Sequence, residues 1–139
     1  MEQNKYRVFV YGTLMRGGRN DHRMTGIYQG DAVTKESTYL MIQFNSTSTK
    51  GAQTPGVLNN GQGHIWGEIY EVDDAGLTDL DKLEDNGRLY QREEILLDDG
   101  SKAWMYILIA DKKPSALQDR VDYDQTENTY KWDPCEPAP

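Results

Sequence analysis

Residues 6–11 constrain the fold of this chain more than any other segment, because they are largely apolar on both sides of an extended backbone. The two alternating sets are Tyr6, Val8 and Val10, and Arg7, Phe9 and Tyr11. Successive side chains of a strand point to opposite faces of a sheet, so this pattern predicts a strand that is buried on most of both faces. Gly12 ends the strand, and the polar residues that follow it predict a loop.

Most of the remaining apolar pattern also has the period of a strand. Such segments occur within residues 27–42, 55–58, 64–72, 89–97 and 103–109. Asn59-Asn60-Gly61 predicts a turn, Asp98-Asp99-Gly100 predicts a hairpin turn, and the polar residues 43–53 predict a surface loop. Six or seven strands with only two short helices predict an α+β fold with a curved or barrel-like sheet.

Two segments carry the signals of a helix. Asn20 can cap a short helix that runs to about Met24. The second helix, residues 77–84, follows Asp73 or Asp74 as its cap. At about 100° per residue, this helix gathers three leucines and one acid on a single arc. They are Leu77, Leu80, Leu83 and Glu84.

Glu84 is the one carboxylate of this segment that points squarely toward apolar side chains. Burial removes hydration from a carboxylate and raises its pKa, which is how a glutamate becomes a general acid or base near neutral pH. A second interpretation stays open, because Asn86-Gly87 ends the helix at once. The helix can fray after Leu83 and leave Glu84 solvated.

The loop after residue 11 is a candidate binding element. Consecutive backbone amides at the end of a strand can bind a carboxylate or polarise a carbonyl. Gly12 and Gly17 are spaced like part of a phosphate loop, but Gly18-Arg19 follows in place of Lys-Ser or Lys-Thr, which argues against a nucleotide site. The two histidines, His22 and His64, have no metal-ligand neighbours at a recognised spacing, so no metal site is expected.

Three further side chains on the predicted strands have more than one interpretation. Glu68 can be a second carboxylate of a site, a solvated residue or the partner of an arginine. Tyr90 and Tyr106 lie on apolar strands and can either pack in the core or line a pocket, and in both cases a buried hydroxyl needs a partner.

Composition bounds the class of protein. A length of 139 residues predicts one domain, and a net charge of −8 argues against nucleic-acid and anionic membrane partners. No apolar run approaches the roughly 20 residues that span a bilayer, and the first residues lack the apolar core of a secretion signal. The single cysteine, Cys135, cannot form an internal disulfide, which favours a cytoplasmic setting. Its proline-rich surroundings argue against a catalytic thiol.

The strand-end loop and the second helix occur together in a known family. The sequences Tyr11-Gly12-Thr13-Leu14 and Leu80-Asp81-Lys82-Leu83-Glu84 resemble those of the γ-glutamylcyclotransferase-like proteins, and most closely the small branch that includes γ-glutamylamine cyclotransferase. The resemblance covers roughly residues 6–109. Its other elements are residues 8–10, Arg16-Gly17, Asn20, His22, Pro55-Gly56, residues 67–70, Tyr90-Gln91-Arg92 and the strand that contains Tyr106.

The resemblance implies a compact mixed sheet that is partly closed as a barrel, with short helices packed around it. It also implies that the substrate's own α-amino group attacks a γ-glutamyl amide and releases 5-oxoproline, without a metal or an organic cofactor. Glu84 matches the family's catalytic acid and base, although Asp85-Asn86-Gly87 stands where the family often has glycine. The expected substrate-binding residues are Tyr11, Gly12, Thr13, Leu14, Tyr90 and Tyr106.

The leading hypothesis is a cyclotransferase that acts on γ-glutamylamines or γ-glutamyl-lysine isopeptides. Related alternatives are γ-glutamyl amino acids or a γ-glutamyl-protected biosynthetic intermediate as substrate. Two other classes remain, namely a non-catalytic module that binds a small metabolite in the same pocket and a protein that binds partners through its acidic surface. We expect one domain over residues 6–110, a polar extension over residues 111–139 that packs irregularly on or near it, and a monomer or weak homodimer.

Overall fold

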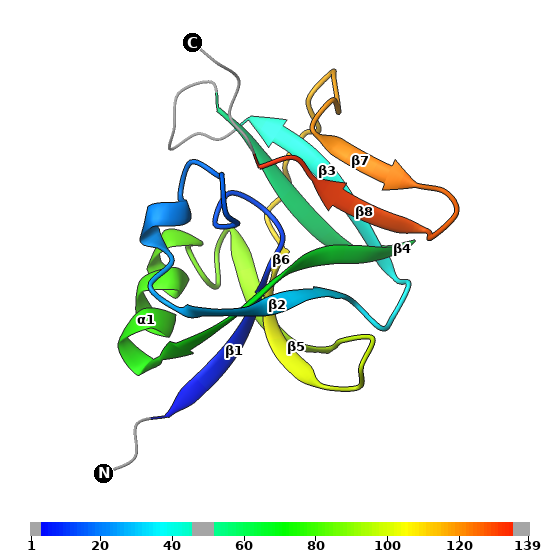
Figure 1. Ribbon diagram of the computed structural model, residues 1–139. Coiled ribbons are helices and arrows are strands. Elements are labelled where there is room, and N and C mark those ends of the chain that lie inside the picture. Colours follow the sequence, from blue (N-terminus) through cyan, green and yellow to red (C-terminus); the bar gives the residue numbers. More distant parts are fainter. Residues whose placement is uncertain (1–3, 46–51, 135–139) are drawn as a thin grey trace.

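The structure is a computed structural model and describes residues 4–45 and 52–134 (Figure 1). Within these ranges it contains eight strands, one α-helix and one short 3-10 helix. In chain order they are β1 (Lys5–Val10), η1 (Asp21–Arg23), β2 (Ile27–Val33), β3 (Tyr39–Asn45), β4 (Gln53–Asp73), α1 (Asp74–Leu83), β5 (Tyr90–Leu96), β6 (Lys102–Leu108), β7 (Val121–Asp124) and β8 (Thr129–Trp132). Cys135 and residues 46–51 of the expected surface loop lie outside the described residues.

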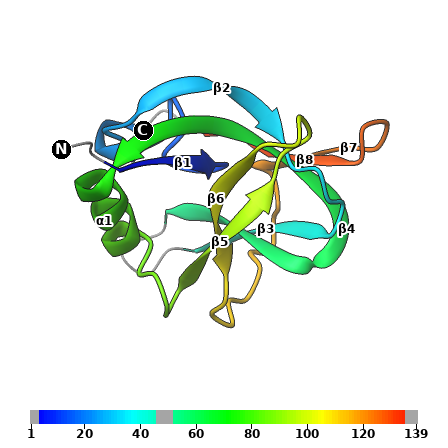
Figure 2. The ribbon, with the colours of Figure 1, turned by 90° about the horizontal axis from the view of Figure 1, so that it is seen from below.

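The strands form one mixed sheet that curves without closing. Hydrogen-bonded neighbours follow the order β5-β6-β1-β4-β8-β7, and β2 and β3 pair with β4 outside this path. The β1–β6 and β4–β8 pairs are parallel, and the other pairs are antiparallel. The helix α1 lies at one end of the sheet, beside the start of β1 (Figures 1 and 2). This arrangement confirms the predicted α+β fold with a curved mixed sheet.

The two halves of the long strand β4 pair with different strands of the sheet. Its second half pairs with β1 along one edge and with β2 along the other, and its first half pairs with β3. Figure 2 shows β4 arching away from α1 and turning back beside β3. Gly67 lies where β4 passes β1, and a Cβ there would come within 2.4 Å of the carbonyl oxygen of Val10. The close approach therefore requires glycine at this position.

The prediction that a turn at Asn59-Asn60-Gly61 separates two strands is wrong. Both flanks of this segment pair with β3 and not with each other, because the register steps from Leu40↔Leu58 to Tyr39↔Gly63. The segment is therefore a bulge within one strand. The Gly61 N–H fixes it by donating to the Thr38 carbonyl at 3.0 Å.

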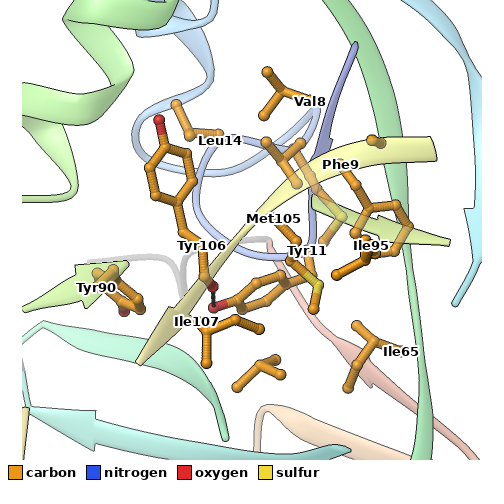
Figure 3. Packing of buried hydrophobic residues seen from close by; sticks show 14 of the residues in the cluster. Val8, Phe9, Tyr11, Leu14, Ile65, Tyr90, Ile95, Met105, Tyr106 and Ile107 are labelled. Carbon is orange, nitrogen blue, oxygen red and sulfur yellow. Dashed lines mark hydrogen bonds between the residues drawn. The ribbon is translucent and has the colours of Figure 1, made fainter. Parts of the chain in front are cut away.

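The strand β1 is the interior strand that its apolar pattern predicts. It lies between β4 and β6, and the side chains of Val8 and Phe9 are fully buried. Figure 3 shows Phe9 near Ile95, and both Val8 and Phe9 belong to the core cluster that includes buried side chains of β4, β5 and β6. The loop that starts at Tyr11 consequently leaves the sheet from inside the core, where Tyr11 is 6% exposed.

The C-terminal segment is more regular than its polar composition predicts. The strands β7 and β8 form an antiparallel hairpin, and β8 pairs in parallel with β4 at Ile65↔Tyr130. Trp132 is 1% exposed and belongs to the core. The expectation that this region packs irregularly is thus wrong for residues 121–132, because the backbone pairing with β4 was not visible in the local composition.

Both predicted helices are present, although their ends differ from the prediction. The side chain of Asp73 caps α1 by accepting a hydrogen bond from Gly76 N at 2.8 Å. The helix stops at Leu83, so Glu84 is its C-cap. Only one 3-10 turn follows Asn20, whose side chain donates to Thr13 Oγ1 at 3.0 Å and does not cap that turn.

Candidate active site

Glu84 directly follows the last residue of α1, and its backbone N–H is still hydrogen-bonded to the helix. Its N–H donates to the carbonyl oxygen of Leu80 at 2.9 Å, which completes the last turn. The next residue, Asp85, has the left-handed φ of 50°, and its 51% exposed side chain lies 3.8 Å from Arg88 Nε. Glu84 therefore still lies on the inward side of the helix that its periodicity predicts, although the helix ends one residue earlier.

A small cavity of about 40 Å³ lies between the end of α1 and the strand-end loop. It brings together Glu84 and all six residues that the family resemblance implies for substrate binding. Its complete lining is Phe9, Val10, Tyr11, Gly12, Thr13, Leu14, Thr54, Pro55, Glu84, Tyr90 and Tyr106. These residues come from β1, β4, β5 and β6, from the C-cap of α1 and from the loop after β1, so the cavity exists only in the assembled sheet.

The carboxyl group of Glu84 has an altered proton affinity. Burial raises the pKa of Glu84 from 4.5 to about 7, and the nearby positive charge of Arg19 opposes this shift. No residue in the described ranges donates a hydrogen bond to this carboxylate. A carboxyl group with a pKa near neutrality and without a fixed donor can accept and return a proton during a reaction. The helix does end after Leu83, as the alternative interpretation has it, but the Glu84 side chain is only partly exposed.

The strand-end loop lines the cavity and contains two backbone amides that have no acceptor among the described residues. Its shape is fixed by hydrogen bonds from Met15 N to the Gly12 carbonyl at 3.1 Å and from Asn20 N to the Thr13 carbonyl at 3.0 Å. The N–H groups of Thr13 and Leu14 donate to no acceptor in the described parts of the chain. A Cβ at Gly12 would lie 2.5 Å from the Pro55 ring, so only glycine allows the loop to approach β4 this closely.

The three tyrosines of the cavity form walls with their hydroxyl groups already engaged. The Tyr11 hydroxyl donates to the Tyr106 carbonyl at 2.7 Å, which Figure 3 shows as a dashed line. The Tyr90 hydroxyl donates to the Pro55 carbonyl at 2.7 Å, and the Tyr106 hydroxyl donates to Asp81 Oδ1 at 2.7 Å. Burial raises the pKa of all three hydroxyls, so they stay neutral at ordinary pH.

The geometry can be compared with known proteins. The sequence profile of the family described as γ-glutamyl cyclotransferase, AIG2-like, matches residues 8–132. The chain belongs to this family. Because the match extends to residue 132, the predicted limit of the resemblance near residue 109 is too short, and the hairpin of β7 and β8 lies within the matched region.

Individual relatives agree with this family. The chain is 35% identical over 103 residues to the γ-glutamylcyclotransferase family protein YtfP of Escherichia coli, covering 73% of this chain and 80% of that protein. It is 38% identical over 96 residues to γ-glutamylaminecyclotransferase A of Danio rerio, covering 65% and 57% of the two chains. An AIG2-like protein from Mus musculus has a similar structure, with a TM-score of 0.61, 25% identity and coverage of 97% and 99%.

Glu68 proves to be the partner of an arginine and does not line the cavity of this γ-glutamyl cyclotransferase family member. Its carboxylate accepts hydrogen bonds from Arg16 N and Arg16 Nε, each at 3.0 Å, and from the Tyr70 hydroxyl at 3.0 Å. Because Arg16 N belongs to the loop that starts at Tyr11, Glu68 fixes the outer part of that loop to β4. Of the three interpretations that the sequence left open for Glu68, the arginine partner is confirmed.

Asp81 is a positioning residue that the sequence reasoning missed. It accepts hydrogen bonds from the Tyr106 hydroxyl and from Arg92 Nε, at 2.7 and 2.9 Å, and so ties β5 and β6 to α1. Its position three residues before Glu84 places it near the same face of α1, but its partners come from other strands, so the helix alone does not indicate this role. Thr54 and Pro55 also line the cavity, and only the pairing of β4 with β3 places them there.

An open basin adjoins the cavity and carries most of the charge around it. The two share Thr13, Thr54, Glu84 and Tyr90, and the basin has a volume of about 520 Å³. Its other lining residues are Arg19, Asn20, Arg23, Phe44, Lys82, Leu83, Asp85, Leu89 and Lys112.

Within the described ranges, no group of three or more His, Cys, Asp or Glu side chains could hold a metal ion, and no helix is long and apolar enough to cross a membrane.

Proposed function

We propose that this protein is a cyclotransferase that cleaves a γ-glutamyl amide into 5-oxoproline and a free amine. The observation that carries the proposal is Glu84, a carboxyl group with a pKa of about 7 in the same small cavity as the loop that holds the Thr13 and Leu14 amides. Family membership supports the class of reaction. The cavity supplies the two groups that this class requires, a base and a site for negative charge.

Glu84 would move the proton that starts and ends the reaction. The α-ammonium of the substrate has a pKa near 8 and must lose a proton before its nitrogen can attack. The Glu84 carboxylate takes this proton, and the free amine attacks the γ-carbonyl carbon to form a five-membered ring. The protonated Glu84 then donates to the nitrogen of the leaving amine as the amide bond breaks. The ring nitrogen gives its second proton to the regenerated Glu84 carboxylate, which passes it to the released amine or to solvent and leaves the neutral lactam. The matched proton affinities of Glu84 and the ammonium keep these transfers favourable.

The strand-end loop would hold the charge that develops during ring closure. As the nitrogen attacks, the γ-carbonyl oxygen becomes an oxyanion, and free backbone amides stabilise it without reorganisation. The N–H groups of Thr13 and Leu14 are available for this oxygen or for the α-carboxylate of the substrate. Holding the glutamyl chain folded between the loop and Glu84 supplies an effective molarity on the order of 10⁵ M or more.

We assign the two ends of the substrate to the small cavity and to the adjoining basin. With a volume of about 40 Å³, the cavity is assigned to the compact reacting end of the glutamyl group. The leaving amine would therefore extend into the basin that shares Glu84 and Tyr90 with the cavity. The finer assignment to γ-glutamylamines or γ-glutamyl-lysine rests on the resemblance and on the name of the Danio rerio relative, and γ-glutamyl amino acids are the alternative.

The direct test is the substitution Glu84→Gln, which keeps the shape of the side chain and removes the base. Release of 5-oxoproline from a panel of γ-glutamyl amides should fall by on the order of 10²- to 10⁴-fold. Asp79→Asn is the matched control, because Asp79 is an exposed acid on the same helix and outside the cavity. Turnover by Glu84→Gln at nearly the wild-type rate would reject the proposal. Ligand binding without turnover by the wild-type protein would favour the non-catalytic module.

A further inference from the structure

The basin beside Glu84 has a charge opposite to that of the whole chain. Four cationic side chains line it, although the chain has a net charge of −8. They are Arg19, Arg23, Lys82 and Lys112. The basin holds only two acids, Glu84 and Asp85, of which Glu84 has a pKa of about 7 and Asp85 lies 3.8 Å from Arg88. The basin is thus a positive region on an acidic protein.

The four cations converge from different parts of the fold and do not form one run in the sequence. Arg23 ends η1, Lys82 lies in the last turn of α1, and Lys112 follows β6. No ion pair joins these three side chains to a residue in the described ranges. Within the described residues, none of these three charges is therefore held in a direct ion pair.

Arg19 connects this positive region to the reacting centre. Its guanidinium donates to the Gln53 carbonyl at 2.6 Å and to Thr54 Oγ1 at 2.7 Å, which fixes it against the start of β4. It lies close enough to lower the pKa of Glu84 against the larger effect of burial. A fixed cation at this position acts on whatever group the substrate places next to the scissile bond.

We infer that the basin selects γ-glutamyl conjugates whose leaving amine carries negative charge, such as an acidic amino acid or a short peptide with a free carboxylate. The inference rests on the proposed function, because it assumes that the glutamyl end occupies the cavity. All γ-glutamyl substrates share that end, so the basin can discriminate only between leaving groups. A leaving group with an additional ammonium would meet four like charges, whereas a carboxylate would meet opposite ones.

The expected size of the preference follows from partly exposed charges. Each cation of this kind contributes little by itself, because water and salt screen it. Several cations acting on one group, with opposite signs for the two kinds of leaving group, should together give a difference of about ten- to a hundredfold in kcat/KM. Because screening weakens all of these interactions, the preference should shrink as ionic strength rises.

The test uses three γ-glutamyl amides of similar length, formed with 4-aminobutyrate, n-butylamine and 1,4-diaminobutane. They carry an anionic, a neutral and a cationic leaving group. We expect kcat/KM for 5-oxoproline release to decrease in that order, with a ratio of at least about tenfold between the first and the last. Equal rates for the three amides, or a preference for the diamine, would overturn the inference.

A pair of double variants separates the basin from the general charge of the protein. Arg23→Gln combined with Lys82→Gln should reduce the ratio between the anionic and the neutral amide severalfold. Lys35→Gln combined with Lys131→Gln removes the same charge from outside the basin and should keep the ratio. An unchanged ratio in the first double variant contradicts the inference even if the order of the three amides is as expected.

Failure of the inference can be distinguished from failure of the proposed function. Release of 5-oxoproline from any of the three amides supports the cyclotransferase, whatever the order of the rates. Titration calorimetry with Glu84→Gln measures the affinities of the same amides without turnover. The anionic amide should bind at least about tenfold more tightly than the cationic one. If none of the amides binds or reacts, both proposals are rejected.

Discussion

Two glutamates near the strand-end loop have opposite surroundings. Glu68 lies on β4 with a side chain that is 5% exposed, and it accepts hydrogen bonds from Arg16 N, Arg16 Nε and Tyr70. Glu84 lies at the C-cap of α1 beside apolar and aromatic walls, and no described residue donates to its carboxylate. Burial raises the pKa of Glu84 to about 7.

The comparison shows that the donors around a carboxylate decide what burial does to it. A buried carboxylate that accepts several hydrogen bonds becomes a fixed anchor, and here Glu68 anchors the loop through Arg16. Glu84 is only partly exposed and has no described donor, so burial raises its pKa and the carboxyl group is available for proton transfer. Only the second kind suits the acid and base of the proposed reaction. Glu68 therefore has a structural role, and Glu84 has the proposed chemical role.

The largest effect on stability is expected when the anchor is broken. Glu68→Gln removes the charge that faces Arg16 and replaces one accepting oxygen by a donor. The free energy of unfolding should decrease by about 2 to 3 kcal/mol, because the hydrogen bonds lost are to a charged group. Urea unfolding at neutral pH measures this change.

The matched control for this experiment is Glu71→Gln on the same strand. Glu71 is less buried than Glu68 and accepts from Gln29 Nε2 at 3.2 Å. Its substitution should change the free energy of unfolding by less than about 1 kcal/mol. Similar losses for Glu68→Gln and Glu71→Gln would show that Glu68 does not anchor the loop.

The second prediction tests the other glutamate through the pH dependence of stability. The pKa of Glu84 is about 7 in the fold and 4.5 ordinarily, so between these values the folded protein binds more protons than the unfolded chain. Stability is therefore lost as the pH rises from 4.5 toward 7. Glu84→Gln avoids this loss and should be more stable than wild type by about 1 to 3 kcal/mol above pH 7.

Urea unfolding between about pH 5.5 and about pH 8.5 measures this difference. Asp79→Asn serves as the control, because it removes one negative charge from the exposed side of the same helix. The advantage of Glu84→Gln over this control should grow with pH. A constant difference across the range would mean that burial does not penalise the charged form of Glu84.

The sequence predicts those features that depend on neighbours along the chain. The burial of Val8 and Phe9 and the inward direction of Glu84 follow from local periodicity. The residue types before the helix predict a cap at Asp73 or Asp74, and Asp73 is the one observed. Glu84 keeps this direction because its N–H still bonds to the Leu80 carbonyl beyond the end of α1.

Features that depend on pairing between distant strands could not be predicted in this way. The continuity of β4 through residues 59–61 depends on β3, and the regular C-terminal hairpin depends on the pairing of β8 with β4. The role of Glu68 depends on Arg16, which precedes it by 52 residues. Local composition carries no information on such contacts, and the missed role of Asp81 has the same origin, because Tyr106 and Arg92 come from other strands.

The smallest expected effect concerns the tyrosine that closes the cavity near Glu84. The Tyr106 hydroxyl is engaged by Asp81, so Tyr106 should act as a wall and not as an acid or base. Tyr106→Phe should reduce the free energy of unfolding by about 1 kcal/mol and reduce 5-oxoproline release only severalfold. Tyr90→Phe, whose hydroxyl donates to the Pro55 carbonyl, is the matched comparison and should behave alike. If Tyr106→Phe alone lost as much activity as Glu84→Gln, the proton transfer assigned to Glu84 would have to include the Tyr106 hydroxyl.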